Sequence, residues 1–470
     1  MTTLIIDMGS SSIRALLFDA HAQAIPGALA RRAHRFSAEA TADPVALRRL
    51  VEACIDDVMA HPAAGSTVAV GMATFVSNLT GLDADGAPAT PLYTYADTAS
   101  SPDADSLRRQ ADQTATHART GCRIHPAYHP AKLHRLRQTQ PDLFARVSRW
   151  TDFATYCYAT WFGRDVPCSY SVASWSGLLD RHALTWDGPW LDRLGLTRDH
   201  LPPLADFDAA QRGLDNTYAR RWPALRAAPF FLAVGDGAAA NIGSGGGDPA
   251  HPVLTIGTTA ALRVVDPAPG PVPLALWAYR VDAARHLIGG ATSEGGNVFA
   301  WARDTLKLET DAIDAVLLKR APGAHGLTAL PLFAGERSPG YHAGATAALH
   351  GLRLTTTPLD IVHALLEGVA LRLRLIYDHM GRPGDAVLAG GGALTGSAGW
   401  AQIVSDVLDV PLHLTDMAEA TAAGVALLIA RRTPRPTITR TVSPRPGSAE
   451  PVAALLDRQA HLYARLLAEG

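Results

Sequence analysis

The chain has 470 residues, and nearly half of them are hydrophobic, which is enough for two domains with their own cores and makes a third unnecessary. Its 42 basic residues are balanced by 44 acidic ones, so the net charge of −2 argues against general attraction to nucleic acid or to an anionic membrane surface. No apolar run is long enough to span a bilayer. With no signal-peptide pattern and four scattered cysteines, we expect a cytoplasmic protein with reduced thiols and no histidine metal site.

The first elements in chain order form a hairpin. Residues 4–6 are apolar, residues 7–12 read Asp-Met-Gly-Ser-Ser-Ser, and residues 13–18 are again mostly apolar, which predicts strand, polar turn, strand. Glycine and small hydroxyl residues in a tight turn point N–H and O–H groups at one spot, which suits phosphate oxygens. Asp7 at the strand end could hold Mg²⁺, and Arg14 could either add charge near a phosphate or pair with an acidic neighbour. Alone, the pattern fits a serine-rich surface hairpin equally well.

The next elements are a helix at residues 44–60, a buried strand at 68–72 and an extended segment at 91–97. Residues 105–230 are expected to be rich in helix. A strand-like run at 230–234 then ends in Gly235-Asp236-Gly237, which we interpret as a carboxylate in a flexible turn. Such a group can take the proton of an attacking hydroxyl, although a turn aspartate that binds its own backbone is the simpler local explanation.

The second half opens by repeating the first pattern. A glycine-rich stretch at residues 243–249 is the best linker candidate. After it, an apolar run at 253–256 leads into Gly257-Thr258-Thr259 and a second apolar run at 260–265. Two hairpins of one kind, one in each half, suggest two related domains facing each other.

Three further segments stand out. Residues 388–394 read Leu-Ala-Gly-Gly-Gly-Ala-Leu, a strand that enters a triple glycine where backbone can approach a flat ligand such as adenine. Residues 335–339 read Gly-Glu-Arg-Ser-Pro, which suits an ion pair or a hinge. Residues 433–449 are rich in proline and arginine and are expected to be an extended connector to a closing helix at about 451–468.

In this order the segments resemble the FGGY carbohydrate kinases, a branch of the actin-like ATPase superfamily, and the gluconate-kinase-like members in particular. The resemblance extends from residue 4 to about residue 430. It implies an α/β fold with two actin-like (ribonuclease H-like) domains and a cleft between them. We expect the N-terminal, sugar-side domain at residues 1–245, the C-terminal, nucleotide-side domain at 251–431, and a tail with its closing helix at 432–470.

The resemblance also implies roles for individual residues. It implies ATP and Mg²⁺ as cofactors, with Asp236 as the catalytic base and Asp7 as the carboxylate for the metal. The residues implied for ATP are Gly9, Ser10, Ser11, Ser12, Arg14, Gly257, Thr258, Thr259, Gly296, Gly391, Gly392 and Gly396. Those implied for the sugar are Thr80, Asp97, Tyr128, Asp236 and Gly237.

The sugar itself stays open at this point. Gluconate is the first choice, a pentulose such as xylulose or ribulose is the alternative, and a non-catalytic sugar-binding sensor is a third. The loop Asn78-Leu79-Thr80 departs from the aromatic or Met-His pair that is frequent in the family, and Arg135 stands where a tryptophan is usual. Arg123, Lys132 or His129 could supply a cation for an acidic sugar. We expect no nucleic-acid or membrane partner, and a homodimer is left open.

Overall fold

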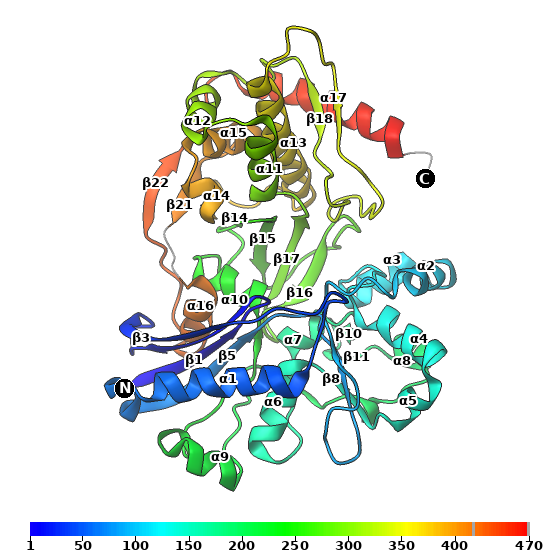
Figure 1. The fold of residues 1–470 in the computed structure, drawn as a ribbon, viewed down its shortest axis with the longest axis vertical. Helices are drawn as coiled ribbons and strands as arrows, with labels where there is room; N and C mark the ends of the chain where they lie inside the picture. The colour runs from blue at the N-terminus through cyan, green and yellow to red at the C-terminus, as the bar shows by residue number, and fades with distance from the viewer. Residues whose placement is uncertain (416–418, 468–470) are drawn as a thin grey trace.

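The computed structural model describes residues 1–415 and 419–467. It has two α/β domains, one above the other in Figure 1, each with helices packed on a central sheet. The prediction of a two-domain α/β fold is therefore confirmed. Within these described ranges, no helix is both long enough and apolar enough to cross a membrane.

The first domain is built on the sheet β13–β5–β1–β2–β3. β1 and β2 form the predicted hairpin and β3 extends it, all antiparallel, whereas β5 and β13 run parallel to β1. The strand expected at residues 230–234 is shorter than predicted, because Phe230 makes only isolated bridges to Val70 and Gln211. These strands are β1 (Thr2–Met8), β2 (Ser12–Phe18), β3 (Ala24–Ala33), β5 (Thr67–Thr74) and β13 (Val234–Gly235).

The second domain repeats this arrangement in the sheet β16–β17–β15–β14–β20–β21–β22. β14, β15 and β17 are antiparallel neighbours, and β20 and β21 continue parallel to β14. The order β21–β20–β14–β15–β17 thus matches β13–β5–β1–β2–β3, so the duplication inferred from the two hairpins extends through both sheets. The strands are β14 (Val253–Ile256), β15 (Ala260–Asp266), β16 (Trp277–Arg280), β17 (His286–Thr292), β20 (Val387–Gly390), β21 (Leu412–Thr415) and β22 (Ile438–Val442).

The remaining elements surround these sheets. α1 begins where predicted because Asp43 accepts hydrogen bonds from the N–H groups of Val45 and Ala46, and Pro44 occupies the first turn. The helices are α1 (Pro44–Met59), α2 (Ser101–Gln110), α3 (Gln113–Thr120), α4 (His129–Thr139), α5 (Pro141–Arg146), α6 (Phe153–Phe162), α7 (Tyr170–Ser174), α8 (Gly188–Leu194), α9 (Asn216–Arg221), α10 (Asp236–Gly243), α11 (Gly296–Leu306), α12 (Thr310–Lys319), α13 (Pro358–His379), α14 (Gly392–Thr395), α15 (Ala398–Leu408), α16 (Ala420–Ile429) and α17 (Ala449–Leu467). Short 3₁₀ helices are η1 (Pro62–Ser66), η2 (Arg198–His200) and η3 (Pro223–Leu225), and short strands are β4 (Thr41–Ala42), β6 (Thr80–Leu82), β7 (Leu92–Tyr93), β8 (Arg149–Thr151), β9 (Cys168–Ser169), β10 (Leu179–Asp180), β11 (Thr185–Trp186), β12 (Leu204–Ala205), β18 (Thr328–Leu330) and β19 (Ala348–His350).

The two domains are joined by elements that cross between them. Helix α16 comes late in the chain, yet it packs against β1, β5 and α10 of the first domain (Figure 1). A Cβ atom on Gly243 of α10 would lie 1.8 Å from the carbonyl oxygen of Ala420, and one on Gly424 of α16 would lie 1.9 Å from that of Ala239. The two helices therefore approach backbone to backbone, which only glycine allows at these positions.

A second contact joins the edge of the C-terminal sheet to the first domain. The backbone N–H of Ala278 in β16 donates to the carbonyl oxygen of Gly121 at 2.9 Å, and that of Arg280 donates to Ser174 Oγ at 2.8 Å. Gly121 has a φ of +69°, and a Cβ there would collide with Ala278. Strand β16 is thereby fixed on the loops that carry the expected sugar side.

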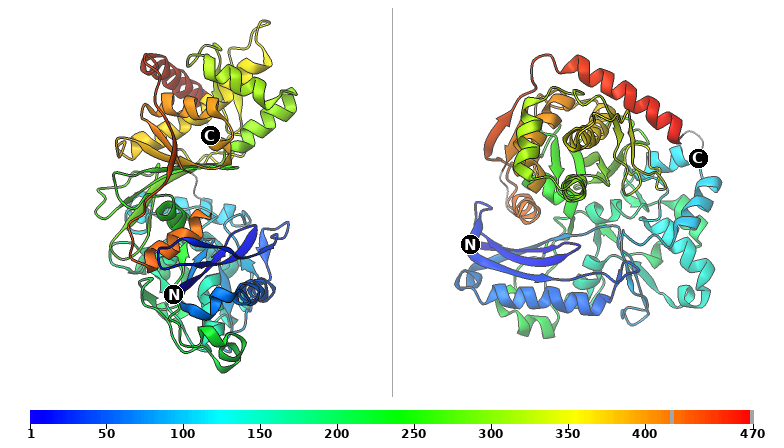
Figure 2. Two further views of the ribbon diagram at one scale, coloured as in Figure 1. Left: turned by 90° about the vertical axis from the view of Figure 1, so that its left-hand side faces the viewer. Right: turned by 45° about the horizontal axis from the view of Figure 1, so that its top comes forward.

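The C-terminal tail is more ordered than predicted. Residues 433–449 were expected to be only a connector, but β22 lies among them and pairs antiparallel with β21 at the edge of the sheet. The sequence Ile-Thr-Arg-Thr-Val of β22 is rich in β-branched residues, which favours a strand. Helix α17 then runs back over the second domain towards α2 and α3, as the right-hand view of Figure 2 shows.

A buried polar cluster fixes the loop before β18 to helix α13. Glu367 accepts hydrogen bonds from His325 Nε2 at 2.7 Å and from the N–H of Gly323 at 3.0 Å, and His363 Nε2 lies 3.0 Å from its other oxygen. The N–H of Leu327 donates to His325 Nδ1, so the proton of that ring is on Nε2, where it donates to the carboxylate. These donors hold the pKa of Glu367 at about 2 despite its burial, so we interpret the cluster as a hydrogen-bonded support.

We expect Glu367→Gln to lower the free energy of unfolding by about 2–4 kcal/mol, because it leaves two buried histidines without their carboxylate. Urea unfolding at neutral pH measures this. Asp378→Asn is the matched control, since Asp378 is an exposed carboxylate on the same helix, and its loss should cost at most about 1 kcal/mol. Equal losses in the two variants would contradict this account.

Candidate active site

The two carboxylates predicted for catalysis lie at the same edge of the first sheet. β1, β5 and β13 are parallel, and their registers place Met8, Thr74 and Gly235 side by side at the carboxyl ends. Asp7 therefore lies near the end of one strand, and Asp236 directly follows another. The carboxyl ends of parallel strands are where open α/β sheets bind ligands.

Asp236 begins a helix instead of lying in the flexible turn that we predicted. It is the first residue of α10, with Gly235 before it, and its Oδ1 accepts a hydrogen bond from the N–H of Gly237 at 2.8 Å. The alanine-rich sequence after Gly237 favours the helix. A helix start fixes the carboxylate more firmly than a loop does, which suits a group that must meet one hydroxyl.

Both carboxylates have pKa values above the usual range. Burial raises the pKa of Asp236 to about 7 and that of Asp7 to about 6, and repulsion between the two contributes to the shift of Asp236. Arg14 Nη2 lies 2.8 Å from Asp7 Oδ2 and partly offsets its shift. A base whose pKa is near neutral pH is well matched to taking a proton from an alcohol.

The first glycine–serine turn connects β1 and β2 beside Asp7. Gly9 donates its N–H to the carbonyl oxygen of Ser12 at 3.0 Å, which closes the turn. Ser10 and Ser11 are accessible, whereas Ser12 is buried at the start of β2. The other expected member, Arg14, forms ion pairs with Asp7 and with Glu419 before α16, at 2.8 and 2.5 Å. The alternative that Arg14 pairs with acidic neighbours is thus the arrangement observed.

The second turn lies at the equivalent edge of the second sheet. The N–H of Gly257 donates to the carbonyl oxygen of Thr259, and both threonines of the turn are exposed. Helix α11 begins against this turn, since the N–H of Gly296 donates to the carbonyl oxygen of Gly257 at 2.7 Å. A helix N-terminus favours negative charge nearby, so turn and helix together suit a phosphate chain.

Five of the residues predicted for ATP line one cavity of about 560 Å³. Its walls contain the predicted Gly257, Thr258, Gly296, Gly392 and Gly396. The neighbouring Gly391 has a φ of +97°, and a Cβ there would lie 2.3 Å from the carbonyl oxygen of Ile256. Residues that the sequence reasoning missed also line it: Asn297, Phe299, Ala300, Arg303, Thr310, Ala393 and Ser397.

The predicted sugar-side residues are not all together. Asp97 is buried, with Lys132 Nζ 3.8 Å from its carboxylate, and Tyr128 shares a 2.5 Å hydrogen bond with Tyr279. Thr80 is fully buried in β6, where its hydroxyl donates to the carbonyl oxygen of Thr90. The structure therefore gives Thr80 a role inside the sheet, and its hydroxyl has a partner already.

Aromatic residues from both domains lie beside Asp236. Trp175 lies against Gly235 and Gly237, so that a Cβ on either glycine would be within 3.0 Å of its ring. Trp175 stacks on Tyr279 of β16 with ring centroids 3.6 Å apart. Tyr279 in turn contacts Tyr128. Trp175, Tyr279 and Tyr128, which come from both domains, thus form an aromatic floor that extends from Asp236 towards the sugar side.

Three arginines near this floor have no carboxylate partner among the described residues: Arg123, Arg263 and Arg337. Arg263 of β15 is close enough to Asp236 to affect its pKa, and its Nε is buried without a hydrogen-bond partner there. Burial, with a smaller contribution from Arg337, lowers the pKa of Arg263 to about 10, and attraction to Asp236 partly offsets this shift. Beside Asp236, these arginines therefore carry positive charge that no carboxylate neutralises in a salt bridge within the described residues.

A second cavity, of about 670 Å³, lies where both domains and the end of α17 meet. Arg108, Arg123 and His125 line it from the first domain, and Tyr341 and His342 line it from the second. The Arg123 guanidinium lies over the Tyr341 ring, 4.6 Å from its centroid. Asp105, which also lines the cavity, pairs with Arg108, so the remaining positive charge is that of Arg123.

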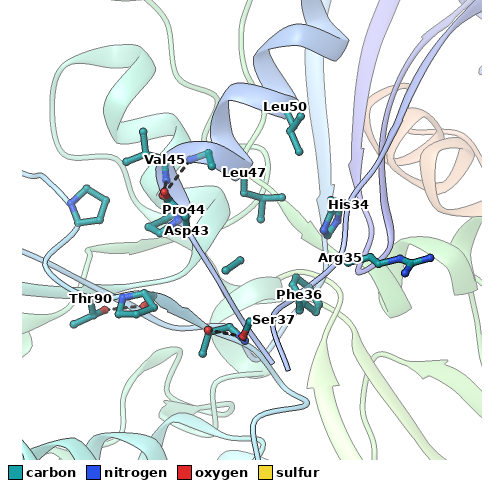
Figure 3. A pocket seen from close by; sticks show the side chains of 15 residues that line it. His34, Arg35, Phe36, Ser37, Asp43, Pro44, Val45, Leu47, Leu50 and Thr90 are labelled. Carbon is teal, nitrogen blue, oxygen red and sulfur yellow. Dashed lines mark hydrogen bonds between the residues drawn. The ribbon is translucent and has the colours of Figure 1, made fainter. Parts of the chain in front are cut away.

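A third cavity, of about 720 Å³, lies behind the first turn and is drawn in Figure 3. Its labelled residues include His34, Phe36, Leu47 and Leu50, and none of the predicted site residues lines it. His34 connects it to the first turn, since its Nε2 lies 2.9 Å from the carbonyl oxygen of Gly9.

Family models place these features in context. The model of the N-terminal domain of the FGGY family of carbohydrate kinases matches residues 2–243, and that of the C-terminal domain matches residues 253–432. The chain therefore belongs to the FGGY family of carbohydrate kinases, for which ATP is the implied phosphate donor. Residues 433–470, with β22 and α17, lie beyond both models.

Individual relatives carry different substrate names. Gluconokinase of Bacillus subtilis (strain 168) is 24% identical over 376 residues, which are 76% of this chain and 73% of that protein. Crystal structures of a gluconate kinase and of a ligand-bound xylulose kinase, both from Lactobacillus acidophilus, each match with a TM-score of 0.92 and 22% identity, over 99% of this chain and 98% of theirs. These similarities show the fold, but they do not identify the sugar, which must be argued from the residues of the site.

We expect Asp236→Asn to lower kcat by about 10²- to 10⁴-fold, because the amide cannot accept the proton of the attacking hydroxyl. ADP release, followed with Mg-ATP and the accepted sugar, measures this. Asp248→Asn, which changes an exposed carboxylate in the loop after α10, should retain wild-type turnover. A variant at Asp236 that keeps most of its turnover would rule out this residue as the base.

The pH profile of kcat/KM for the sugar should show an acid limb near pH 7. Asp236 has a raised pKa of about 7, and only its ionised form accepts a proton, so activity is lost as pH falls through that value. Steady-state rates between about pH 5.5 and 9 would test this, because kcat/KM reports the groups of the free enzyme. A kcat/KM that stays constant down to about pH 5.5 would contradict this, because it would mean that the carboxylate is solvated like an ordinary aspartate.

Proposed function

We propose that the protein transfers the γ-phosphoryl group of ATP to a hydroxyl of a small sugar acid, with gluconate as the first candidate. The observation that carries the proposal is the position of Asp236: a carboxylate with a near-neutral pKa at a sheet edge, beside the first glycine–serine turn and a group of unpaired arginines. The equivalent edge of the second sheet carries the Gly257–Thr259 turn and the 560 Å³ cavity.

The reaction would use these groups as follows. The sugar hydroxyl gives its proton to Asp236 as its oxygen attacks the γ-phosphorus, and the bond from that phosphorus to the β–γ bridging oxygen breaks to release ADP. The N–H and O–H groups at Ser10, Ser11, Ser12, Thr258 and Thr259 would bind the phosphate oxygens, and Gly9, whose N–H closes the first turn, would keep that turn in shape. Adenosine would occupy the cavity lined by Gly296, Gly392 and Gly396, next to Gly391.

The residues at the first turn fit Mg²⁺. Asp7 Oδ2 is buried and accepts no hydrogen bond from the described residues, although Arg14 is nearby, so it has lone pairs for a hard cation or its water. When bound, Mg²⁺ would neutralise charge on the phosphates. Asp7 would hold the ion directly or through water, and the Arg14–Glu419 pair would keep Asp7 oriented.

The unpaired arginines favour an acidic sugar over a neutral one. Arg123, Arg263 and Arg337 gather around the aromatic floor, and a neutral ketose would leave their charges uncompensated. Gluconate carries one carboxylate, and its name occurs among the relatives. Asp97, Tyr128 and Gly237 would bind the hydroxyls of the sugar chain, whereas the buried hydroxyl of Thr80 would support the loop.

We expect D-gluconate or a related sugar acid to give the highest kcat/KM in a coupled ADP-release assay with Mg-ATP. The comparison set is D-xylulose, D-ribulose, L-ribulose and glycerol, with a sugar-free blank. If a pentulose gives the highest kcat/KM, the substrate is a pentulose and not a sugar acid. If ADP release with every compound equals that of the blank, the result favours a non-catalytic sensor.

A further inference from the structure

The last helix of the chain contacts the sugar side of the site, although it lies beyond the family models. Tyr463 of α17 donates its hydroxyl proton to Glu336 Oε2 at 2.6 Å. Glu336 also forms a buried ion pair with Arg372 of α13, whose guanidinium lies 4.7 Å from the centroid of the Tyr463 ring. Gly340 donates its N–H to the other oxygen of Glu336. One buried carboxylate thus receives three donors from three segments.

That carboxylate holds together a loop that faces the cationic cavity. Within residues 336–342, the N–H of Glu336 donates to the carbonyl oxygen of His342, and that of Tyr341 donates to the carbonyl oxygen of Arg337 at 2.7 Å. Gly340 is packed so closely that a Cβ would lie 2.0 Å from the Tyr463 hydroxyl. Tyr463 and Glu336 therefore both pack directly on the loop at Gly340, where there is no room for a side chain.

The loop in turn forms one wall of the 670 Å³ cavity. Tyr341 and His342 line it, and Arg123 stacks on Tyr341 from the opposite domain. Leu466 and Leu467, one turn after Tyr463, complete the same wall. Tyr128 and His125, with ring centroids 6.2 Å apart, connect this cavity to the aromatic floor that leads to Asp236.

We propose that α17 is part of the substrate-binding apparatus, with Tyr463 as a positioning residue that acts through Glu336 on the loop of residues 336–342. The cavity formed there binds the carboxylate of the substrate through Arg123, at the end of the sugar remote from the hydroxyl that reacts at Asp236. The proposal rests on the proposed function, since it says where the carboxylate of the proposed sugar-acid substrate binds.

The test is steady-state kinetics of the full chain with Mg-ATP and D-gluconate for the wild type, Tyr463→Phe and Tyr377→Phe. Tyr463→Phe removes only the hydroxyl that holds Glu336 and keeps the ring beneath Arg372. We expect it to raise KM for gluconate by about tenfold, because the bond to a charged, buried group is lost. KM for ATP should change by less than about twofold, since the nucleotide cavity shares no residue with this wall.

Tyr377→Phe is the matched control, because it removes a comparable buried hydroxyl, bonded to the carbonyl oxygen of Pro383, from helix α13. It should leave both KM values unchanged, and thermal unfolding of each variant shows whether the fold is equally intact. An unchanged KM for gluconate in Tyr463→Phe, or equal increases in the KM for gluconate and for ATP, would overturn the proposal. Wild-type enzyme that does not phosphorylate gluconate would instead overturn the proposed function, and the assignment of the carboxylate would fall with it.

Discussion

The close approach of α10 and α16 is the contact on which the arrangement of the site depends. Gly243 and Gly424 let the two backbones meet without side chains between them. Helix α10 begins at Asp236, and α16 is preceded by Glu419, which pairs with Arg14 beside Asp7. The same contact therefore sets the proposed base, orients the carboxylate proposed for the metal, and fastens an element of the second half of the chain to the first sheet. Any side chain at either glycine would move these groups apart.

Several charged groups of the site have no partner of opposite charge within the described part of the protein. Asp7 and Asp236 are forced towards neutrality by burial, and nearby arginines lack carboxylate partners among the described residues. Buried groups of this kind cost stability, and they persist where a bound molecule compensates them. A polyphosphate with its cation and an acidic sugar would supply both signs of charge.

Much of this arrangement could be predicted because it is encoded locally. The Asp7–Ser12 turn and the Gly257–Thr259 turn each follow a short apolar run, so both hairpins, the repeated fold and the nucleotide-side glycines were accessible to sequence reasoning. Arg263 and Tyr463 were not, because each acquires its neighbours only through contacts between domains or with the tail. Thr80 shows the opposite case: the family resemblance implied that it binds the sugar, whereas tertiary packing buries its hydroxyl against Thr90. The helix at Asp236 was missed because two flanking glycines indicate a turn when read alone.

The most direct test of the account is ³¹P NMR of the wild-type protein incubated with Mg-ATP and D-gluconate. Transfer to a hydroxyl predicts that the γ-phosphate signal is replaced by a phosphomonoester signal in equal amount to the ADP formed, with little inorganic phosphate. Conversion of the γ-phosphate to inorganic phosphate alone would show hydrolysis without transfer to the sugar. That result would contradict the central claim that Asp236 and the two turns form a site for phosphorylating a sugar acid.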